Sequence, residues 1–282
     1  MGEGLAAYDR PGFWIVVEPS NRQRRSGAGV RVVAVANQKG GVGKTTSSVN
    51  LAAALAQHGQ KVLVIDLDPQ GNASQALGVS RGTTGSDMYD VLIEGADLDS
   101  VVRATGIEGL HCAPASVDLA GAEVELVATE DRESQLKQAL SDAEKLDDTI
   151  VIIDCPPSLG LLTVNAFAAA DELFVPIQAE FYALDGVSQL VKTLELVRNG
   201  LNPKLTIGLV ALTMVDDNDP AQARVADEVA GYFGSCLATT RIPRDPHANA
   251  APGQAQTLLQ YAPDSPAAQA YRALATELLV NN

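Results

Sequence analysis

The chain contains 282 residues, of which 46% are hydrophobic; this is enough for one large α/β domain or two small ones, and we predict one. Its net charge of −15 lowers the expectation of contact with a phosphate backbone, although a local basic face could coexist with an acidic remainder. There is no apolar run near the roughly 18 residues that cross a bilayer, no signal-peptide core, and no metal or disulfide pattern among the cysteines and histidines, so we expect a cytoplasmic protein.

Residues 1–29 mix glycine, proline and basic side chains, and we predict that they form an extension outside the core domain. The apolar run Phe13 to Val17 could add an edge strand or dock on the body of the protein. The basic cluster from Arg22 to Arg25 has two interpretations, a nucleic-acid arm or a solvated flexible tail, and the tail is the more common outcome.

From Val30 to Leu51 the chain reads VRVVAVANQKGGVGKTTSSVNL: a β-branched strand, a glycine-rich turn and the start of a helix. The glycines permit backbone angles that let several N–H groups point at phosphate oxygens, and the helix adds its positive dipole end. Lys44 can then reach the β- and γ-phosphates, and the Thr45 hydroxyl can bind Mg²⁺. The predicted nucleotide-binding residues here are Gly40, Gly41, Val42, Gly43, Lys44, Thr45 and Thr46.

Downstream of this loop, apolar strands alternate with helical stretches, as is typical of parallel β-α-β units. The candidate strands are Val30–Ala36, Lys61–Asp66, Gly109–Pro114, Thr149–Asp154, Glu172–Ile177, Thr206–Thr213 and Ala238–Ile242. The candidate helices are Thr45–His58, Gly121–Glu144, Leu161–Ala169, Gly186–Arg198, Pro220–Phe233 and Pro266–Val280. We predict a single α/β domain over residues 30–282: a doubly wound, mostly parallel sheet of P-loop NTPase type with helices on both faces.

Two of the predicted strands end in aspartates. Ligands of such sheets sit beyond the carboxyl ends of the strands, so these side chains should lie near the phosphate loop. Asp66 and Asp68 stand two residues apart, on the same side of an extended chain. Such a pair can hold the Mg²⁺ shell and orient a water for in-line attack, although an Asp-Pro turn would use the same residues. Asp154 ends another strand and fits an aspartate that contacts Mg²⁺ through water.

Six stretches, in order and at the usual spacing across residues 30–280, resemble the ParA/Soj partition ATPases. They are KGGVGKTT, DLDPQGNAS, DLAGAEVEL, IIDCPPSLGLLTVNA, VPIQAEFYALDGVSQL and RIPR. The general pattern G-x-x-x-x-G-K-[ST] fails at its first glycine, which is Gln38 here, and Lys39 follows at once. A lysine in that position resembles the deviant P-loop of the ParA/MinD group, in which it reaches across a dimer interface to the partner's phosphates.

The resemblance implies an ATPase that uses ATP and Mg²⁺, forms a homodimer in the ATP state and is stimulated by a ParB-like partner during plasmid or chromosome partition. Hydrolysis would remove the γ-phosphate and loosen the dimer, so the protein would act as a switch. The implied catalytic residues are Lys39, Lys44 and Asp68, the implied metal residues are Thr45, Asp66 and Asp154, and the implied loop beside the adenine contains Pro243 and Arg244.

The chain departs from the family in the basic residues with which dimers bind DNA non-specifically. His247 and Asn218 stand where arginine is usual, and Gln256 stands where lysine is usual. Neutral side chains release no condensed counterions, so we expect weak, salt-dependent DNA binding, with nucleoid association only if that binding holds. The remaining candidate cations are Lys192, Arg198, Lys204, Arg224, Arg241 and Arg272, each of which is alternatively an ordinary solvated side chain.

Two readings of the function stay open: a partition motor, and a ParA-like ATPase that positions protein cargo or regulates with little DNA binding. Membrane attachment of the MinD kind needs a basic amphipathic carboxyl-terminal helix, and the tail YRALATELLVNN carries only Arg272. A nitrogenase-type iron protein needs paired cluster cysteines, and Cys112 and Cys155 do not lie in matching contexts. We therefore expect no membrane partner and no iron–sulfur cluster.

Overall fold

Seven strands form one sheet in the computed structural model, which describes residues 29–79, 85–180 and 183–280. The spatial order is β3-β4-β2-β5-β1-β6-β7, and every neighbouring pair is parallel except β3 with β4. The strands are β1 (Arg31–Val35), β2 (Lys61–Asp66), β3 (Arg103–Ala104), β4 (Leu110–Ala113), β5 (Thr149–Asp154), β6 (Glu172–Gln178) and β7 (Thr206–Thr213). The mostly parallel sheet that the sequence predicts is confirmed.

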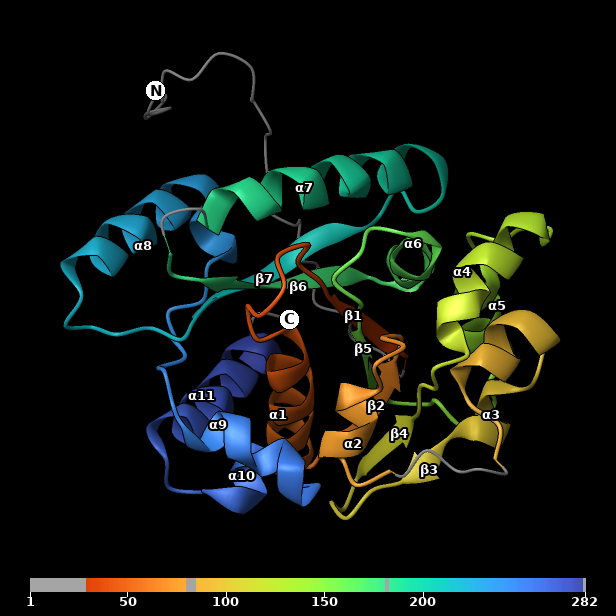
Figure 1. Cartoon of the computed structure of the whole chain (residues 1–282), viewed down its shortest axis with the longest axis horizontal. Coiled ribbons are helices and arrows are strands. Elements are labelled where there is room, and N and C mark those ends of the chain that lie inside the picture. Colours follow the sequence, from red (N-terminus) through yellow and green to blue (C-terminus); the bar gives the residue numbers. More distant parts are fainter. Residues whose placement is uncertain (1–28, 80–84, 181–182, 281–282) are drawn as a thin grey trace.

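Helices cover both faces of the sheet, as Figure 1 shows. One layer contains α1 (Lys44–Gln57), α2 (Asn72–Ala76), α9 (His247–Ala250), α10 (Leu258–Tyr261) and α11 (Pro266–Val280). The other contains α4 (Leu119–Glu125), α5 (Gln135–Asp142), α6 (Leu161–Ala169), α7 (Ala183–Gly200) and α8 (Pro220–Phe233). Alternate residues of β1 serve the two cores: Val33 packs in the cluster with α1, and Val32 in the cluster with α6 and α7.

The predicted strand Ala238–Ile242 is wrong. This segment comes after α8 in the chain and lies beside β7, where it makes only isolated bridges, Leu237 with Val210 and Pro243 with Val215. Its middle turns away from the sheet because the N–H groups of Thr239 and Thr240 donate to the Glu277 carboxylate, at 2.9 and 2.7 Å. The Glu277 side chain of α11 thus accepts the backbone hydrogen bonds that a neighbouring strand would accept in a regular sheet.

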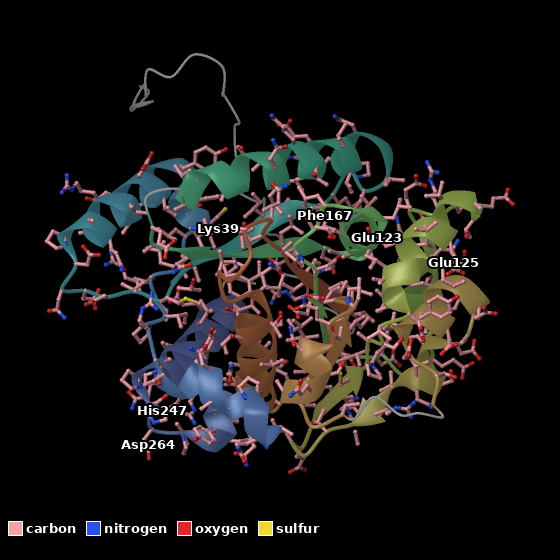
Figure 2. The ribbon with its side chains drawn as sticks, in the orientation of Figure 1. Lys39, Glu123, Glu125, Phe167, His247 and Asp264 are labelled. Atoms are coloured by element: carbon pink, nitrogen blue, oxygen red, sulfur yellow. The ribbon has the colours of Figure 1, made fainter. Side chains whose placement is uncertain are left out.

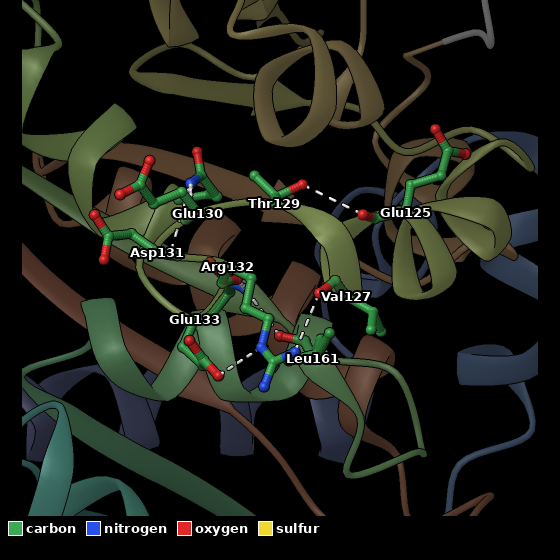
Figure 3. A network of polar contacts seen from close by, with 10 residues as sticks. Glu125, Val127, Thr129, Glu130, Asp131, Arg132, Glu133 and Leu161 are labelled. Atoms are coloured by element: carbon green, nitrogen blue, oxygen red, sulfur yellow. Dashed lines mark hydrogen bonds and ion pairs between the residues drawn. The ribbon is translucent and has the colours of Figure 1, made fainter.

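The predicted helix Gly121–Glu144 is also wrong, because it is split into α4, a 3₁₀ turn η2 (Leu126–Ala128) and α5. Figure 3 shows the polar contacts that occupy the break. The Arg132 guanidinium donates to the Val127 carbonyl at 3.2 Å, and Asp131 has a left-handed φ of 51°. The sequence TEDRES, residues 129–134, offers no apolar residue to continue a buried helical face, so side-chain contacts replace the helical hydrogen bonds there.

Four short elements between β2 and β4 escaped prediction, namely α2, the π-helical turn η1 (Asp90–Glu94), α3 (Leu98–Val101) and the antiparallel edge strand β3. Each is five residues or shorter, too short for periodicity to reveal. The predicted extension of residues 1–29 falls almost entirely outside the described residues, which begin at Gly29.

Candidate functional site

The glycine-rich loop between β1 and α1 is anchored to two neighbouring strands and by a hydrogen bond of its own. Asn37 donates from Nδ2 to the Pro176 carbonyl of β6 at 2.9 Å and accepts from the Lys39 N–H at 3.0 Å. Thr213, the last residue of β7, donates to the Val42 carbonyl at 2.8 Å. Gly41 and Gly43 have φ values of 77° and 86°, a region that favours glycine. The loop is therefore attached to β6 and β7 and turns sharply at two glycines.

The amino end of α1 is suited to an anion. Its N-cap residue is Gly43, and no side chain caps the first turn. The first N–H groups of α1 therefore carry the helix dipole toward the loop and are left for a ligand. Lys44 lies at the same point, only 7% exposed, and its Nζ donates to the Lys39 carbonyl at 3.4 Å. Burial lowers the pKa of Lys44, and the nearby carboxylate of Asp154 opposes that shift.

Asp154 ends β5 as predicted, and two hydroxyls of α1 bind its carboxylate. Thr45 Oγ1 donates to Oδ2 at 2.8 Å, and Ser48 Oγ donates to Oδ1 at 2.7 Å. Asp154 is fully buried, and burial raises the pKa of this carboxyl, with Asp66 adding to the shift. The predicted metal residues Thr45 and Asp154 are thus in direct contact, an oxygen donor set of the kind that Mg²⁺ prefers.

Asp66 and Asp68 have different surroundings. Asp66 is fully buried, and its Oδ2 accepts from both the N–H and the hydroxyl of Ser74, at 2.8 and 2.7 Å. Its Oδ1 accepts from the Asp68 N–H at 3.2 Å. Burial raises the pKa of Asp66, and the Ser74 bonds oppose that shift. Asp66 therefore fixes the turn that carries Asp68.

Asp68 itself is 7% exposed, and its Oδ1 accepts from the Gln70 N–H at 2.9 Å. Its charge is close enough to act on both Lys44 and Asp154. The structure therefore brings Lys44, Asp68 and Asp154 together at the mouth of the loop, from three separate elements.

Lys39 points out of the loop and pairs within its own chain. Its Nζ lies 2.9 Å from Glu180 Oε2, and the two side chains are 32% and 49% exposed. Figure 2 shows Lys39 in the loop that leads into α1. Gln178, at the end of β6, donates to the other oxygen of Glu180 at 2.5 Å. This pairing could not be predicted from the sequence, because the two residues stand 141 positions apart.

Sequence reasoning missed Asn37, Ser48 and Glu180. A signal for Ser48 was present: it stands four residues after Lys44 and so on the same helix face. Asn37 and Glu180 act on neighbours that only the folded sheet brings close.

The predicted adenine loop lies on the same rim of the sheet. Pro243 forms a bridge with Val215, and the Arg244 N–H donates to the Val215 carbonyl at 3.1 Å. Met214, next to Val215, approaches Gly43 of the phosphate loop: a Cβ at Gly43 would lie 3.7 Å from the Met214 Cε. The segment Met214–Val215 therefore approaches the phosphate loop on one side and contacts Pro243 and Arg244 on the other.

The positions that depart from the family make local contacts. The ring of His247 lies 2.8 Å from the Asp245 carboxylate, and both nitrogens of Asn218 donate to Asp216. Arg241 faces Asp217 at 3.7 Å. Arg272 donates to Gln57 at 3.0 Å and to a backbone carbonyl at 2.6 Å. The candidate cations Arg241 and Arg272 thus already have partners within the chain.

Other kinds of site find no support in the described part of the chain. Cys112, Cys155 and Cys236 are buried, free thiols. No three metal-binding side chains from His, Cys, Asp and Glu come together among the residues in the described ranges. None of the helices described is both long and apolar enough to cross a membrane.

Comparison with known proteins places these features in a family. A family model described as an AAA domain matches residues 30–207. The sporulation initiation inhibitor protein Soj of Bacillus subtilis is 46% identical over 251 residues, which cover 89% of this chain and 99% of that protein. The chromosome-partitioning ATPase Soj of Thermus thermophilus is 47% identical over 252 residues, covering 89% of this chain and 96% of that protein.

A solved structure shares the fold and shows the ligands of a relative. It is the cobyrinic acid a,c-diamide synthase of Mycobacterium smegmatis with a bound ATP analogue and magnesium. The sequences are 37% identical, the TM-score is 0.77, and the match covers 89% of this chain and 94% of that one.

Proposed function

The chain belongs to the ParA/Soj family of partition ATPases, and from that premise we propose that it is an ATP-dependent switch for segregating a plasmid or chromosome. It hydrolyses ATP and uses Mg²⁺. The observation that carries the proposal is the buried ammonium of Lys44 at the uncapped end of α1, where the charge of the Asp154 carboxylate acts on it. The relatives named for partition are more similar to this chain than the diamide synthase is, so they carry more weight.

The loop residues divide the work of binding. Backbone N–H groups from Gly40 to Thr46 would surround the phosphates, and Lys44 would neutralise their charge. Thr45 would give its hydroxyl to the metal, and Asp154 would hold the metal's water shell. When held by Thr45 and Asp154, Mg²⁺ would supply positive charge against the charge that develops on the phosphate oxygens. Thr45 and Asp154 already contact each other, so the donor set is assembled before the ligand arrives.

Asp68 would orient the attacking water. Its support is the turn that Asp66 and Ser74 hold in place, which keeps the Asp68 carboxylate near Lys44. In this proposal Asp66 belongs to the metal site indirectly, as a positioning residue for Asp68. Pro243 and Arg244 would border the adenine, since their loop lies beside β7 and the phosphate loop.

Lys39 would turn ATP binding into dimerisation. It would leave Glu180 for the phosphates of a second subunit, and hydrolysis would remove part of that contact. The gain depends on the sandwiched nucleotide, so the dimer would be an ATP-state species. A ParB-like partner would stimulate turnover, and DNA binding would be weak. We also propose a cytoplasmic location, with nucleoid association only if the DNA contact holds.

A second candidate is an ATPase of the same family that positions protein cargo and scarcely touches DNA. The observation that favours it is the set of neutral or internally bonded side chains at His247, Asn218 and Arg241. Genomic neighbourhood discriminates the two, because a ParB-like gene beside this one supports partition.

The test is ATP binding and turnover of purified protein, measured with and without duplex DNA and the product of the neighbouring gene. Lys44→Ala should abolish ATP binding, while Lys61→Ala, an exposed lysine on β2, should bind like wild type. Near-normal ATP affinity in Lys44→Ala would refute the assignment of the site. Turnover that responds to the neighbouring gene product but not to DNA would favour the cargo-positioning candidate.

A further inference from the structure

A pocket lies at the amino ends of β2, β4 and β5, away from the nucleotide site. Its volume is about 510 Å³, within the range of about 300–1,000 Å³ that small-molecule sites occupy. Asp66 and Asp154 stand at the other ends of β2 and β5, each of which has six residues. At about 3.3 Å per residue, the pocket is therefore about 15 Å or more from these aspartates.

The register of the strands explains the floor of the pocket. Leu63 of β2 pairs with His111 of β4, and His111 pairs with Ala104 of β3. Side chains of directly paired residues lie on the same face of a sheet, so these three form one row. Lys61 lies on that face as well, two residues before Leu63, and pairs with Thr149 of β5. The floor thus joins apolar side chains to those of Lys61 and His111.

Two apolar side chains from connecting segments form the walls. Val102, which follows α3, and Leu146, which precedes β5, both line the pocket and pack in the same core cluster as Leu63. The Asp99 carboxylate accepts from the Glu144 N–H at 3.0 Å, which ties α3 to the segment after α5. The walls are therefore joined to each other as well as packed on the sheet.

The lining is basic, although the chain as a whole has a net charge of −15. Lys61, Lys145 and His111 line the pocket, and Asp99 is the one acidic residue among the described residues that do so. Within the described ranges, neither the Lys145 ammonium nor the His111 ring has a hydrogen bond or an ion pair. Lys61 Nζ donates to the Asp147 carbonyl at a long 3.5 Å. These basic groups are therefore available to an anion.

We propose that this pocket binds a small organic acid, a molecule with an apolar body and one anionic group. The body would lie over Leu63 and Val102, and the anionic group would meet the ammonium groups of Lys61 and Lys145. The His111 ring would add an N–H donor. The inference does not rest on the proposed function, because the pocket shares no residue with the nucleotide site.

The probe is anilinonaphthalene sulfonate, a fluorescent dye with an apolar ring system and one sulfonate, added to the full-length protein. We expect saturable binding, and octanoate should displace the dye. Phenylnaphthylamine, which has the same rings without the sulfonate, should bind about five- to tenfold more weakly. Octylammonium, whose charge is opposite, should displace no dye.

Variants locate the dye. Lys61→Ala and Lys145→Ala should each weaken binding about two- to fivefold, and the double variant about tenfold. Ala104→Trp should fill the pocket and weaken binding about tenfold or more. Lys137→Ala removes an exposed lysine of α5 that does not line the pocket, and it should bind within about twofold of wild type. ATP binding by each variant shows that it is folded, and the lysine variants decide alone if Ala104→Trp does not fold.

Saturating ATP with Mg²⁺ should leave the dye bound, because the two sites lie at opposite ends of the strands. Displacement by ATP would place the dye at the nucleotide site and overturn the inference. No binding to wild type, equal losses in Lys137→Ala, or unchanged binding in the double lysine variant would do the same. Sedimentation velocity without ATP should give the same mass for Ala104→Trp and wild type. A change in association in that variant would assign the pocket to contact between copies and refute a small-molecule site.

Discussion

Lys39 is tied at the mouth of its loop by an ion pair that the folded sheet creates. Glu180 holds it from the end of β6, and Gln178 in turn holds Glu180. Both charged side chains are well exposed, so the pair itself contributes between about 0 and 1 kcal/mol to stability. The pair matters instead because it keeps the Lys39 ammonium beside Glu180 of the same chain while no second subunit is present.

Replacing Glu180 with glutamine should free Lys39 without harming the fold. We expect the free energy of unfolding to change by less than about 1 kcal/mol and ATP-dependent dimerisation to strengthen a few-fold. Sedimentation velocity over a concentration series measures the second effect. Glu133→Gln, which breaks another exposed pair, should leave dimerisation unchanged. Weaker dimerisation in Glu180→Gln would show instead that Glu180 serves the dimer.

Asp68→Ala should separate ATP binding from hydrolysis. The substitution removes the proposed water-positioning carboxylate, while Lys44 and the Asp154 contact with Thr45 remain. We expect ATP affinity close to wild type, turnover reduced by about 10²-fold or more, and an ATP-bound dimer that persists. Phosphate release and size-exclusion chromatography with ATP measure these outcomes. Turnover near the wild-type rate would remove Asp68 from the mechanism.

The residues of the phosphate loop were predictable because each carries a chemical role at a fixed spacing. Lys44, Thr45 and Asp154 meet as expected, since strand ends and a loop at one rim leave little freedom. Asp66 was harder, because its partner Ser74 lies eight residues on, in a short helix that the sequence did not predict. The two-residue spacing predicts Asp66 and Asp68 on the same side of the chain. In the fold, hydrogen bonds from Ser74 hold the Asp66 carboxylate, and the Gln70 N–H donates to Asp68, so the two carboxylates have different surroundings.

At the scale of the element, α6 links the loop after Asp154 to the connection between η2 and α5. Its residue Asn165 satisfies two groups of that connection and also donates to the Leu161 carbonyl at 3.0 Å. Asn165 is fully buried, so its loss would leave polar backbone groups without partners. The Asn165 side chain thus accepts from an N–H group in the first turn of α5, where the N-cap residue Ser134 provides no side-chain cap.

Asn165→Ala should therefore destabilise the protein by about 1–3 kcal/mol. Urea unfolding followed by circular dichroism gives the change in the free energy of unfolding. Asn249→Ala, on the exposed face of α9, is the matched control and should lie within about 0.5 kcal/mol of wild type. A similar stability in both variants would mean that water replaces the Asn165 bonds.

Elements with strong periodicity were predicted almost to the residue, and helices α6, α8 and α11 have the predicted bounds. The segment at 238–242 did not follow prediction because Glu277, distant in sequence, accepts its backbone hydrogen bonds. The helix predicted at 121–144 is interrupted by the polar run TEDRES, and Asn165 of α6 binds the backbone at the break. No single window of sequence contains the contacts made by Glu277 and Asn165.

At the scale of the whole molecule, the net negative charge limits the affinity for DNA. The net charge is −15, and Arg241 and Arg272 are engaged within the chain. Of the other candidates, Arg198 and Arg224 lie on α7 and α8, which share one layer (Figure 1). A dimer would offer only a few phosphate contacts from this layer, so affinity must depend on low salt.

We expect duplex DNA to bind the ATP state at about 50 mM salt and to lose about ten- to thirtyfold in affinity by about 150 mM. Arg198→Ala and Arg224→Ala should each reduce the slope of log affinity against log salt by about 1. Arg103→Ala, on β3 at the opposite edge of the sheet from β7, should not. Fluorescence anisotropy measures each slope. The absence of any binding at about 50 mM salt would refute weak DNA binding and favour the cargo-positioning role.

The contact between α1 and α11 has a consequence for when the protein becomes competent during its synthesis. Ser47, three residues after Lys44, shares a buried hydrogen bond of 3.1 Å with Tyr271, which stands 224 positions later. The helix that begins at the phosphate loop thus receives this cover only when α11 has left the ribosome. Contacts of such long sequence separation are slow to form. A nascent chain that ends before α11 would carry every nucleotide-binding motif while the helix that starts at Lys44 still lacked its packing partner.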